Sequence, residues 1–97
     1  MSDRRVVVTG IGMLTPLAST CSESWRLMCE GQSGIAPIAS FDTEGFPVRI
    51  AGEVPEFDLA EFLPPKESRR MDGFIQHGLV AGIQAVRDSG FEVTDEN

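Results

Sequence analysis

Consecutive apolar positions near the beginning of the chain predict a β-strand that is covered on both faces. Val6–Val8 is β-branched throughout and does not alternate with polar residues, a pattern typical of a parallel sheet. Gly10-Ile11-Gly12 follows and predicts a tight turn, and Pro16 keeps Thr15 out of the helical region. A strand that opens an α/β unit needs a second parallel strand after a crossover, and no later segment provides a strong one. We therefore expect an α/β fold that is incomplete within these 97 residues.

The next segment has the spacing of an amphipathic helix. Thr20 and Glu23 are placed as in a capping box, which predicts that the helix begins at Thr20 and ends before Gly31. Apolar residues within it recur at i, i+3 and i+4, and we expect them to form its buried face: Trp25, Met28 and Cys29.

A longer helix is predicted over Ser68–Ser89, with Gly90 immediately after its end. Its apolar stripe has spacings of three to four residues and consists of Met71, Ile75, Leu79, Ile83 and Val86. Beside the stripe runs a ridge of small residues that would let another backbone approach closely: Gly78, Ala81, Gly82 and Ala85. Polar residues such as Asp72, Gln84 and Arg87 exclude a membrane span, so the ridge predicts tight packing within a core.

The segment between the two helices is rich in loops, because five of the six prolines lie in residues 32–65. Within it, we predict a short strand over Val48–Val54. Asp58 is positioned to cap a short helix that continues to Leu63, and Pro64-Pro65 must end that helix.

Length and charge narrow the classes of function. A chain of 97 residues and 10.5 kDa is one domain at most. Its net charge of −7 argues against nucleic acid or an anionic membrane as its partner. Arg4-Arg5 before an apolar run mimics a signal peptide, but glycine and proline interrupt the run and no cleavage site follows. Two cysteines are too few for a disulfide scaffold and fit a reducing, cytoplasmic location.

Two candidate small-molecule sites are weak. Gly10-x-Gly12 resembles the start of a dinucleotide fingerprint, but Thr15 occupies the third glycine position, so a structural turn is favoured and no cofactor is expected. Cys21 lies in the first turn of a predicted helix, where a thiol can become reactive. A nucleophile also needs a base, and His77, the only histidine, lies on another helix. We therefore expect Cys21 and Cys29 to be structural, and no metal site.

The basic cluster formed by Lys66, Arg69 and Arg70 is the more informative feature. Residues 64–70 carry three bases and one acid, whereas residues 41–63 carry six acids and one base. The cluster is spaced so that its side chains share one face of a helix. It would lie at the beginning of the longer helix, where the helix dipole disfavours positive charge. Two interpretations follow: a solvated turn, or a docking patch that steers an acidic partner.

Several blocks in one order resemble the β-ketoacyl-[acyl-carrier-protein] synthase II family, the elongating condensing enzymes of type II fatty-acid synthesis. Together they extend over essentially the whole chain: residues 4–17 (RRVVVTGIGMLTPL), Glu23-Ser24-Trp25, Gly31–Ile35, Phe41-Asp42, Arg49–Gly52, Lys66–Asp72 and Phe74-Ile75-Gln76. Each block alone would be weak evidence for the family. The Arg-Arg-Met-Asp and Phe-Ile-Gln blocks favour synthase II over synthase I and polyketide ketosynthases.

The resemblance implies a thiolase-like fold with α-β-α-β-α layers, of which residues 1–97 would be part of the N-terminal half. It implies a homodimer whose cysteine nucleophile, two histidines and lysine support decarboxylative Claisen condensation with malonyl-acyl-carrier-protein. None of these catalytic residues matches a position in this chain, and neither Cys21 nor His77 fits the family's motifs. Lys66, Arg69 and Arg70 match positions that in relatives contact the acidic helix of acyl carrier protein. The alternative is a stand-alone interaction module that binds an acidic partner through the same cluster.

Overall fold

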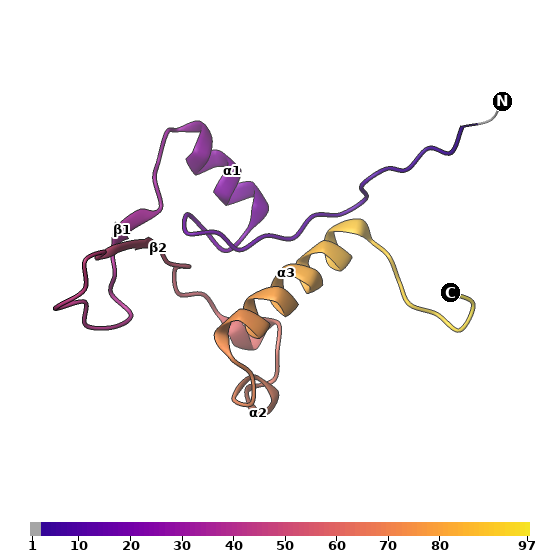
Figure 1. Ribbon diagram of the computed structural model, residues 1–97. Helices are drawn as coiled ribbons and strands as arrows, with labels where there is room; N and C mark the ends of the chain where they lie inside the picture. Colours follow the sequence, from indigo (N-terminus) through magenta and orange to yellow (C-terminus); the bar gives the residue numbers. More distant parts are fainter. Residues whose placement is uncertain (1–2) are drawn as a thin grey trace.

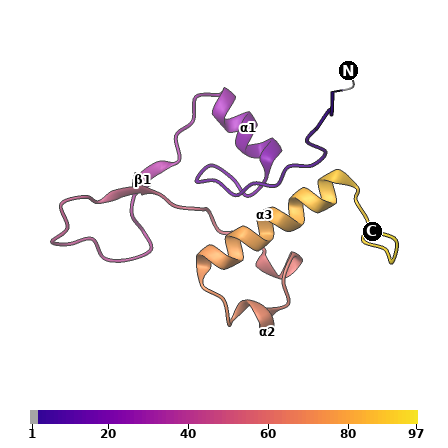
Figure 2. The same cartoon turned by 45° about the vertical axis from the view of Figure 1, so that its right-hand side comes forward.

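The computed structural model describes residues 3–97 and consists of helices and one small sheet joined by long irregular segments (Figures 1 and 2). The elements, in chain order, are α1 (Cys21–Cys29), β1 (Ile35–Pro37), β2 (Ile50–Gly52), the 3₁₀ turn η1 (Leu59–Glu61), α2 (Pro65–Ser68) and α3 (Gly73–Ser89). In both views the N-terminal segment passes between α1 and α3, and α2 lies near the N-terminal end of α3.

The strand predicted at Val6–Val8 is absent from this part of the chain, and that prediction is wrong for the structure. The segment is extended but unpaired, and Val6 and Val8 are 92% and 78% exposed. A strand requires hydrogen bonds to a neighbouring strand, and within residues 3–97 only β1 and β2 pair. The three valines are apolar, as a covered strand requires, but within residues 3–97 no other segment covers their side chains.

Gly10 and Gly12 do not form the predicted tight turn either, because residues 10–12 continue the irregular segment without a turn. They run along α3 instead, where a Cβ atom on Gly10 would overlap the Ala85 carbonyl and one on Gly12 the Ala81 carbonyl. The predicted small-residue ridge therefore does admit a close backbone at Ala81 and Ala85. Its other two members, Gly78 and Gly82, have open space at the Cβ position.

Helix α1 begins as predicted, because the Thr20 hydroxyl accepts a hydrogen bond from the Glu23 N–H at 3.3 Å. Its predicted buried face is wrong, since Trp25 is 64% exposed and Met28 and Cys29 are also exposed. The buried residue of the helix is Ser24, at 1% exposure. Periodicity identifies an apolar face but does not supply the element that would cover it.

The two strands form an antiparallel pair in which Ala36 lies opposite Ala51. The strand predicted over Val48–Val54 is therefore present but shorter, and β1 was not predicted. Pro16 packs on the pair, because a Cβ atom on Gly52 would lie 2.7 Å from the Pro16 Cγ.

The helix predicted over Ser68–Ser89 begins later, at Gly73, because Ser68 is the last residue of the separate short helix α2 and residues 69–72 belong to neither helix. Asp72 is extended (φ −68°, ψ 158°) and occupies the N-cap position of α3 without a side-chain hydrogen bond to the helix. The helix ends as predicted at Gly90, in the left-handed region (φ 71°). The sequence predicts that Pro65 ends the preceding helix, and in the structure Pro65 is also the first residue of α2. Proline is common at the first position of a helix.

Little apolar surface is buried. The buried apolar side chains are Ala18, Leu63 and Val80. The accessible surface is 7909 Å², against about 5,400 Å² for a compact protein of this mass. The radius of gyration is 17.4 Å, against about 12.5 Å for a compact domain of this length. Among the residues described, no helix is long and apolar enough to cross a membrane.

Candidate protein-docking site

The basic cluster lies on the short turn that joins η1 to α3. Lys66 is in α2, Arg69 is the residue at its C-terminal cap with helical backbone angles, and Arg70 follows. The Arg69 N–H donates to the Pro65 carbonyl at 3.2 Å and the Arg70 N–H to the Glu67 carbonyl at 3.1 Å. The first bond continues the helical turn through Arg69, so Lys66 and Arg69, three residues apart, lie on one side of it. The second is an i→i−3 bond that tightens the end of the turn at Arg70.

All three basic side chains of the cluster are exposed. Within residues 3–97, the ion pairs both belong to Arg26, which bridges Glu23 and Glu30 along α1. The charges of Lys66, Arg69 and Arg70 are thus not neutralised by carboxylates of this part of the chain. The cluster lies in and just after α2 and precedes the first residue of α3, Gly73, so it stands before the N-terminus of the longer helix and not within its first turn.

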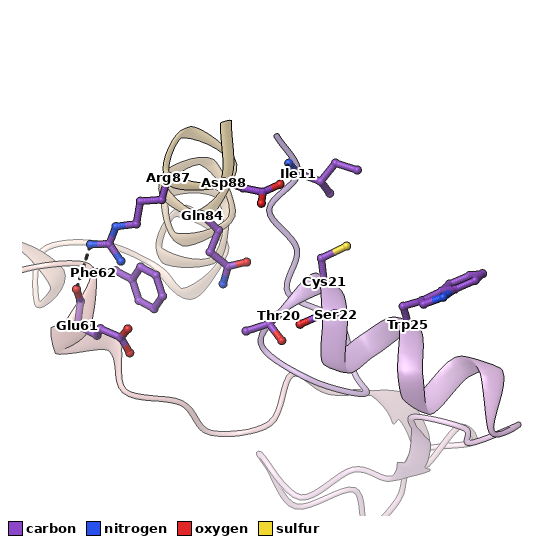
Figure 3. Close-up of a pocket in the computed structure, with 10 residues that line it drawn as sticks. All are labelled: Ile11, Thr20, Cys21, Ser22, Trp25, Glu61, Phe62, Gln84, Arg87 and Asp88. Carbon is purple, nitrogen blue, oxygen red and sulfur yellow. Dashed lines mark hydrogen bonds between the residues drawn. The ribbon is translucent and has the colours of Figure 1, made fainter. Parts of the chain in front are cut away.

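A second candidate is the cavity of about 530 Å³ between α1, η1 and the C-terminal half of α3 (Figure 3). Cys21 and Trp25 line it from α1, and Phe62 and Arg87 line it from the other side. Arg87, the basic side chain drawn in Figure 3, is directed at Phe62 and the Glu61 carbonyl and away from the Cys21 thiol. His77 contacts the Phe57 ring elsewhere, at 6.3 Å between ring centroids. The structure therefore does not bring the thiol and the imidazole together.

Three polar side chains that line this cavity bind other segments of the same chain. Arg87 lies 5.0 Å above the Phe62 ring and donates to the Glu61 carbonyl at 3.4 Å. Asp88 accepts a hydrogen bond from the Ile11 N–H at 3.0 Å, and Gln84 accepts one from the Met13 N–H at 3.0 Å. The Ile11 and Met13 amides flank Gly12 and are occupied by side chains of α3. Gly10 and Gly12 thus allow the N-terminal segment to pack closely against α3.

The sequence comparison identifies the family. Residues 3–97 match the β-ketoacyl synthase N-terminal domain. The chain belongs to the β-ketoacyl synthase family. The resemblance found in the sequence blocks is therefore confirmed.

Three curated relatives share the name 3-oxoacyl-[acyl-carrier-protein] synthase 2. The chain is 55% identical over 97 residues to a 3-oxoacyl-[acyl-carrier-protein] synthase 2 of Vibrio harveyi. It is 54% identical to the protein of that name from Vibrio cholerae and 42% identical to that from Coxiella burnetii. Each match covers 100% of this chain and 23% of the relative. The chain thus spans about a quarter of the length of these relatives.

A solved structure of a ketosynthase gives the same result at the level of the fold. The ishigamide ketosynthase/chain length factor superposes with a TM-score of 0.79 at 34% identity. The match covers 94% of this chain and 23% of that chain.

Proposed function

We propose that this chain is the N-terminal part of an enzyme that lengthens acyl chains by decarboxylative Claisen condensation on acyl carrier protein. The observation that carries the proposal is the 55% identity, over every residue of the chain, to a 3-oxoacyl-[acyl-carrier-protein] synthase 2. In the reaction, an enzyme cysteine first attacks the thioester of acyl-carrier-protein, takes the acyl group as a new thioester and releases the carrier-protein thiol. Malonyl-carrier-protein then loses CO₂, and its C2 carbon attacks that thioester. The products are 3-oxoacyl-carrier-protein and the free enzyme thiol.

The family's nucleophile, two histidines and lysine lie outside these residues, and Cys21 is not the nucleophile. Cys21→Ser in the full-length enzyme should therefore leave condensation unchanged, measured as 3-oxoacyl-carrier-protein formed per minute. Loss of turnover to the level without enzyme, in a variant that is still folded, would overturn this assignment of Cys21. The 97 residues alone should show no condensation.

Within this enzyme, we assign Lys66, Arg69 and Arg70 to the docking surface for carrier protein. Three exposed positive charges lie together on a chain whose net charge is −7, and no carboxylate of residues 3–97 pairs with them. An acidic partner is the one that such a cluster attracts. Each exposed pair contributes only about 0–1 kcal/mol, so the cluster acts as a set that steers encounter.

The larger architecture follows from the same proposal. The layered thiolase-like α-β-α-β-α fold would be completed by chain outside these residues, which would also cover the apolar faces of α1 and α3. The enzyme would function as a cytoplasmic homodimer, and light scattering of the full-length protein would give its mass.

The docking assignment is tested by charge reversal in the full-length enzyme. Lys66→Glu with Arg69→Glu should raise the KM for malonyl-carrier-protein about tenfold at low salt. The kcat at saturation should not change, and the difference from wild type should narrow as salt screens the charges. Arg4→Glu with Arg5→Glu is the matched control, since it makes the same change of charge on exposed residues far from α2 (Figure 1). An equal rise in KM in both double variants would show a general charge effect and would refute the assignment.

A further inference from the structure

The side chain of Gln76, in the first turn of α3, joins that helix to the segment that carries the basic cluster. Its Nε2 donates to the Ser68 carbonyl at 2.8 Å and to the Met71 carbonyl at 3.4 Å. These two carbonyls stand immediately before Arg69 and immediately after Arg70 in the chain. One carboxamide therefore holds the backbone on both sides of two of the three basic residues.

The turn needs this support because α2 has four residues, and a helix of one turn is not stable by itself. Its own bonds close it locally: the Ser68 hydroxyl donates to the Pro65 carbonyl at 3.1 Å, and the Met71 N–H donates to the Ser68 carbonyl at 3.1 Å. Among the hydrogen bonds of residues 3–97, those of Gln76 are the ones that link the Ser68–Met71 segment to the body of α3. This side chain thus adds a second link between the turn and α3, beside the covalent one through Asp72, whose carbonyl accepts from the Ile75 and Gln76 N–H groups.

The chemistry of the carboxamide suits this role. Ser68 is buried, and Gln76 is half-buried between the turn and α3. The Ser68 carbonyl already accepts from the Met71 N–H, and the carboxamide gives it a second donor without adding a charge beside Arg69 and Arg70. A lysine or arginine would also satisfy the carbonyls but would change the charge of the docking surface.

We propose that Gln76 is a positioning residue of the carrier-protein docking surface. It acts through the backbone of residues 68–71 and fixes the direction in which Arg69 and Arg70 meet an acidic partner. The inference rests on the proposed function, because it assigns to Gln76 a supporting role in the same docking surface. Binding to a fixed array of charges loses less conformational freedom than binding to a mobile one, so release of the turn weakens docking even when every charge remains.

The test uses Gln76→Met in the full-length enzyme, which keeps the length of the side chain and the helix propensity but removes the donor. We expect the KM for malonyl-carrier-protein to rise about twofold to tenfold, as for loss of one or two hydrogen bonds. The kcat and the kinetic constants with small acyl and malonyl thioesters that lack the carrier protein should not change. Gln76→Ala serves as a second variant if the methionine variant does not fold.

Gln84→Met is the matched control on the same helix. Gln84 also bridges α3 to a distant backbone, donating to the Ser19 carbonyl at 2.6 Å and accepting from the Met13 N–H at 3.0 Å. Both variants should lower the melting temperature, but only Gln76→Met should raise the KM for the carrier protein. An equal rise with small thioesters, or an equal rise in Gln84→Met, would show a general structural effect and overturn the proposal.

The failure of this inference differs from the failure of the docking assignment. If Lys66→Glu with Arg69→Glu raises the KM for carrier protein and Gln76→Met does not, the docking surface stands and the positioning role is wrong. If neither variant raises the KM for carrier protein, the cluster is not the docking surface, and the proposed role of Gln76 is wrong as well.

Discussion

Thr15 and Ser24 share a hydrogen bond of 2.8 Å between their hydroxyl oxygens. Through it, the loop before α1 is tied to the most deeply buried side chain of that helix. The Thr15 oxygen also accepts from the Leu17 N–H at 3.1 Å and from the Ala18 N–H at 3.2 Å. One hydroxyl thus organises the chain reversal that brings the N-terminal segment back against α1.

Thr15→Val should therefore destabilise the full-length protein by about 1–3 kcal/mol, because it keeps the shape of the side chain, leaves the Leu17 and Ala18 N–H groups without their acceptor and removes the hydrogen bond with the Ser24 hydroxyl. The measurement is the free energy of unfolding in urea. Thr15→Ser, which retains the oxygen, should recover most of the loss. Equal stability of the valine and serine variants would contradict the role of the hydroxyl.

The contact between Gly12 and the Ala81 carbonyl leads to a second prediction. A Cβ atom at residue 12 has no room against the backbone of α3, so Gly12→Ala should cost about 1–3 kcal/mol through overpacking. Gly73→Ala is the control, because the space around Gly73 is open and alanine is the better helix former. Thermal unfolding should show a lower melting temperature for Gly12→Ala alone. A melting temperature that stays at the wild-type value would mean that the N-terminal segment does not lie against α3.

Local signals were sufficient to predict the parts of the fold that local physics determines. The cap at Thr20, the left-handed Gly90 and the close approach at Ala81 and Ala85 are all present. The break at Asp72 was not predicted, because an apolar stripe continues through it at helical spacing. Strand β1 was missed because three residues that end in proline carry little pattern.

Burial was the least predictable property, for a physical reason. An apolar face shows that something covers it, but not which segment does so. Trp25 and Val6 belong to such faces and are exposed here, and the chain spans 23% of the length of its relatives. For the candidate site, charge contrast was enough to find Lys66, Arg69 and Arg70. Gln76 carried no comparable signal, because its partners are backbone carbonyls, which sequence patterns do not show.

Glu53 gives a prediction that depends on pH. Its carboxylate accepts from the Ala39 N–H at 2.7 Å and the Ser40 N–H at 3.2 Å, which closes the loop between β1 and β2. The Ala39 N–H, followed by the bonds from Ser40, holds the pKa of Glu53 below its usual value. Since the pKa is lowered on folding, the stabilising effect is fully present above the unfolded pKa of about 4.3. It is lost as the pH falls through the folded pKa.

The stability difference between wild type and Glu53→Gln should therefore be largest near neutral pH and should shrink as the pH falls below about 4. Unfolding in urea at a series of pH values measures it. Glu56→Gln is the control, because no hydrogen bond to the Glu56 carboxylate is found within residues 3–97. If the stability difference between wild type and Glu53→Gln instead grew toward acid pH, the pKa of Glu53 would be raised on folding, which would contradict the prediction.

The last prediction concerns Val6–Val8, whose apolar side chains and backbone have no partner among residues 3–97. If the full-length enzyme has the layered fold proposed above, a neighbouring strand supplies both the ladder hydrogen bonds and the cover. Hydrogen exchange in the full-length protein should then show slow exchange of the amides of residues 6–8, comparable to that of Val80, which is buried within α3. Val7→Asp should cost several kcal/mol there, because it would bury a charge between two layers. Exchange at residues 6–8 as rapid as in an unstructured peptide would mean that this segment is not a strand of the enzyme.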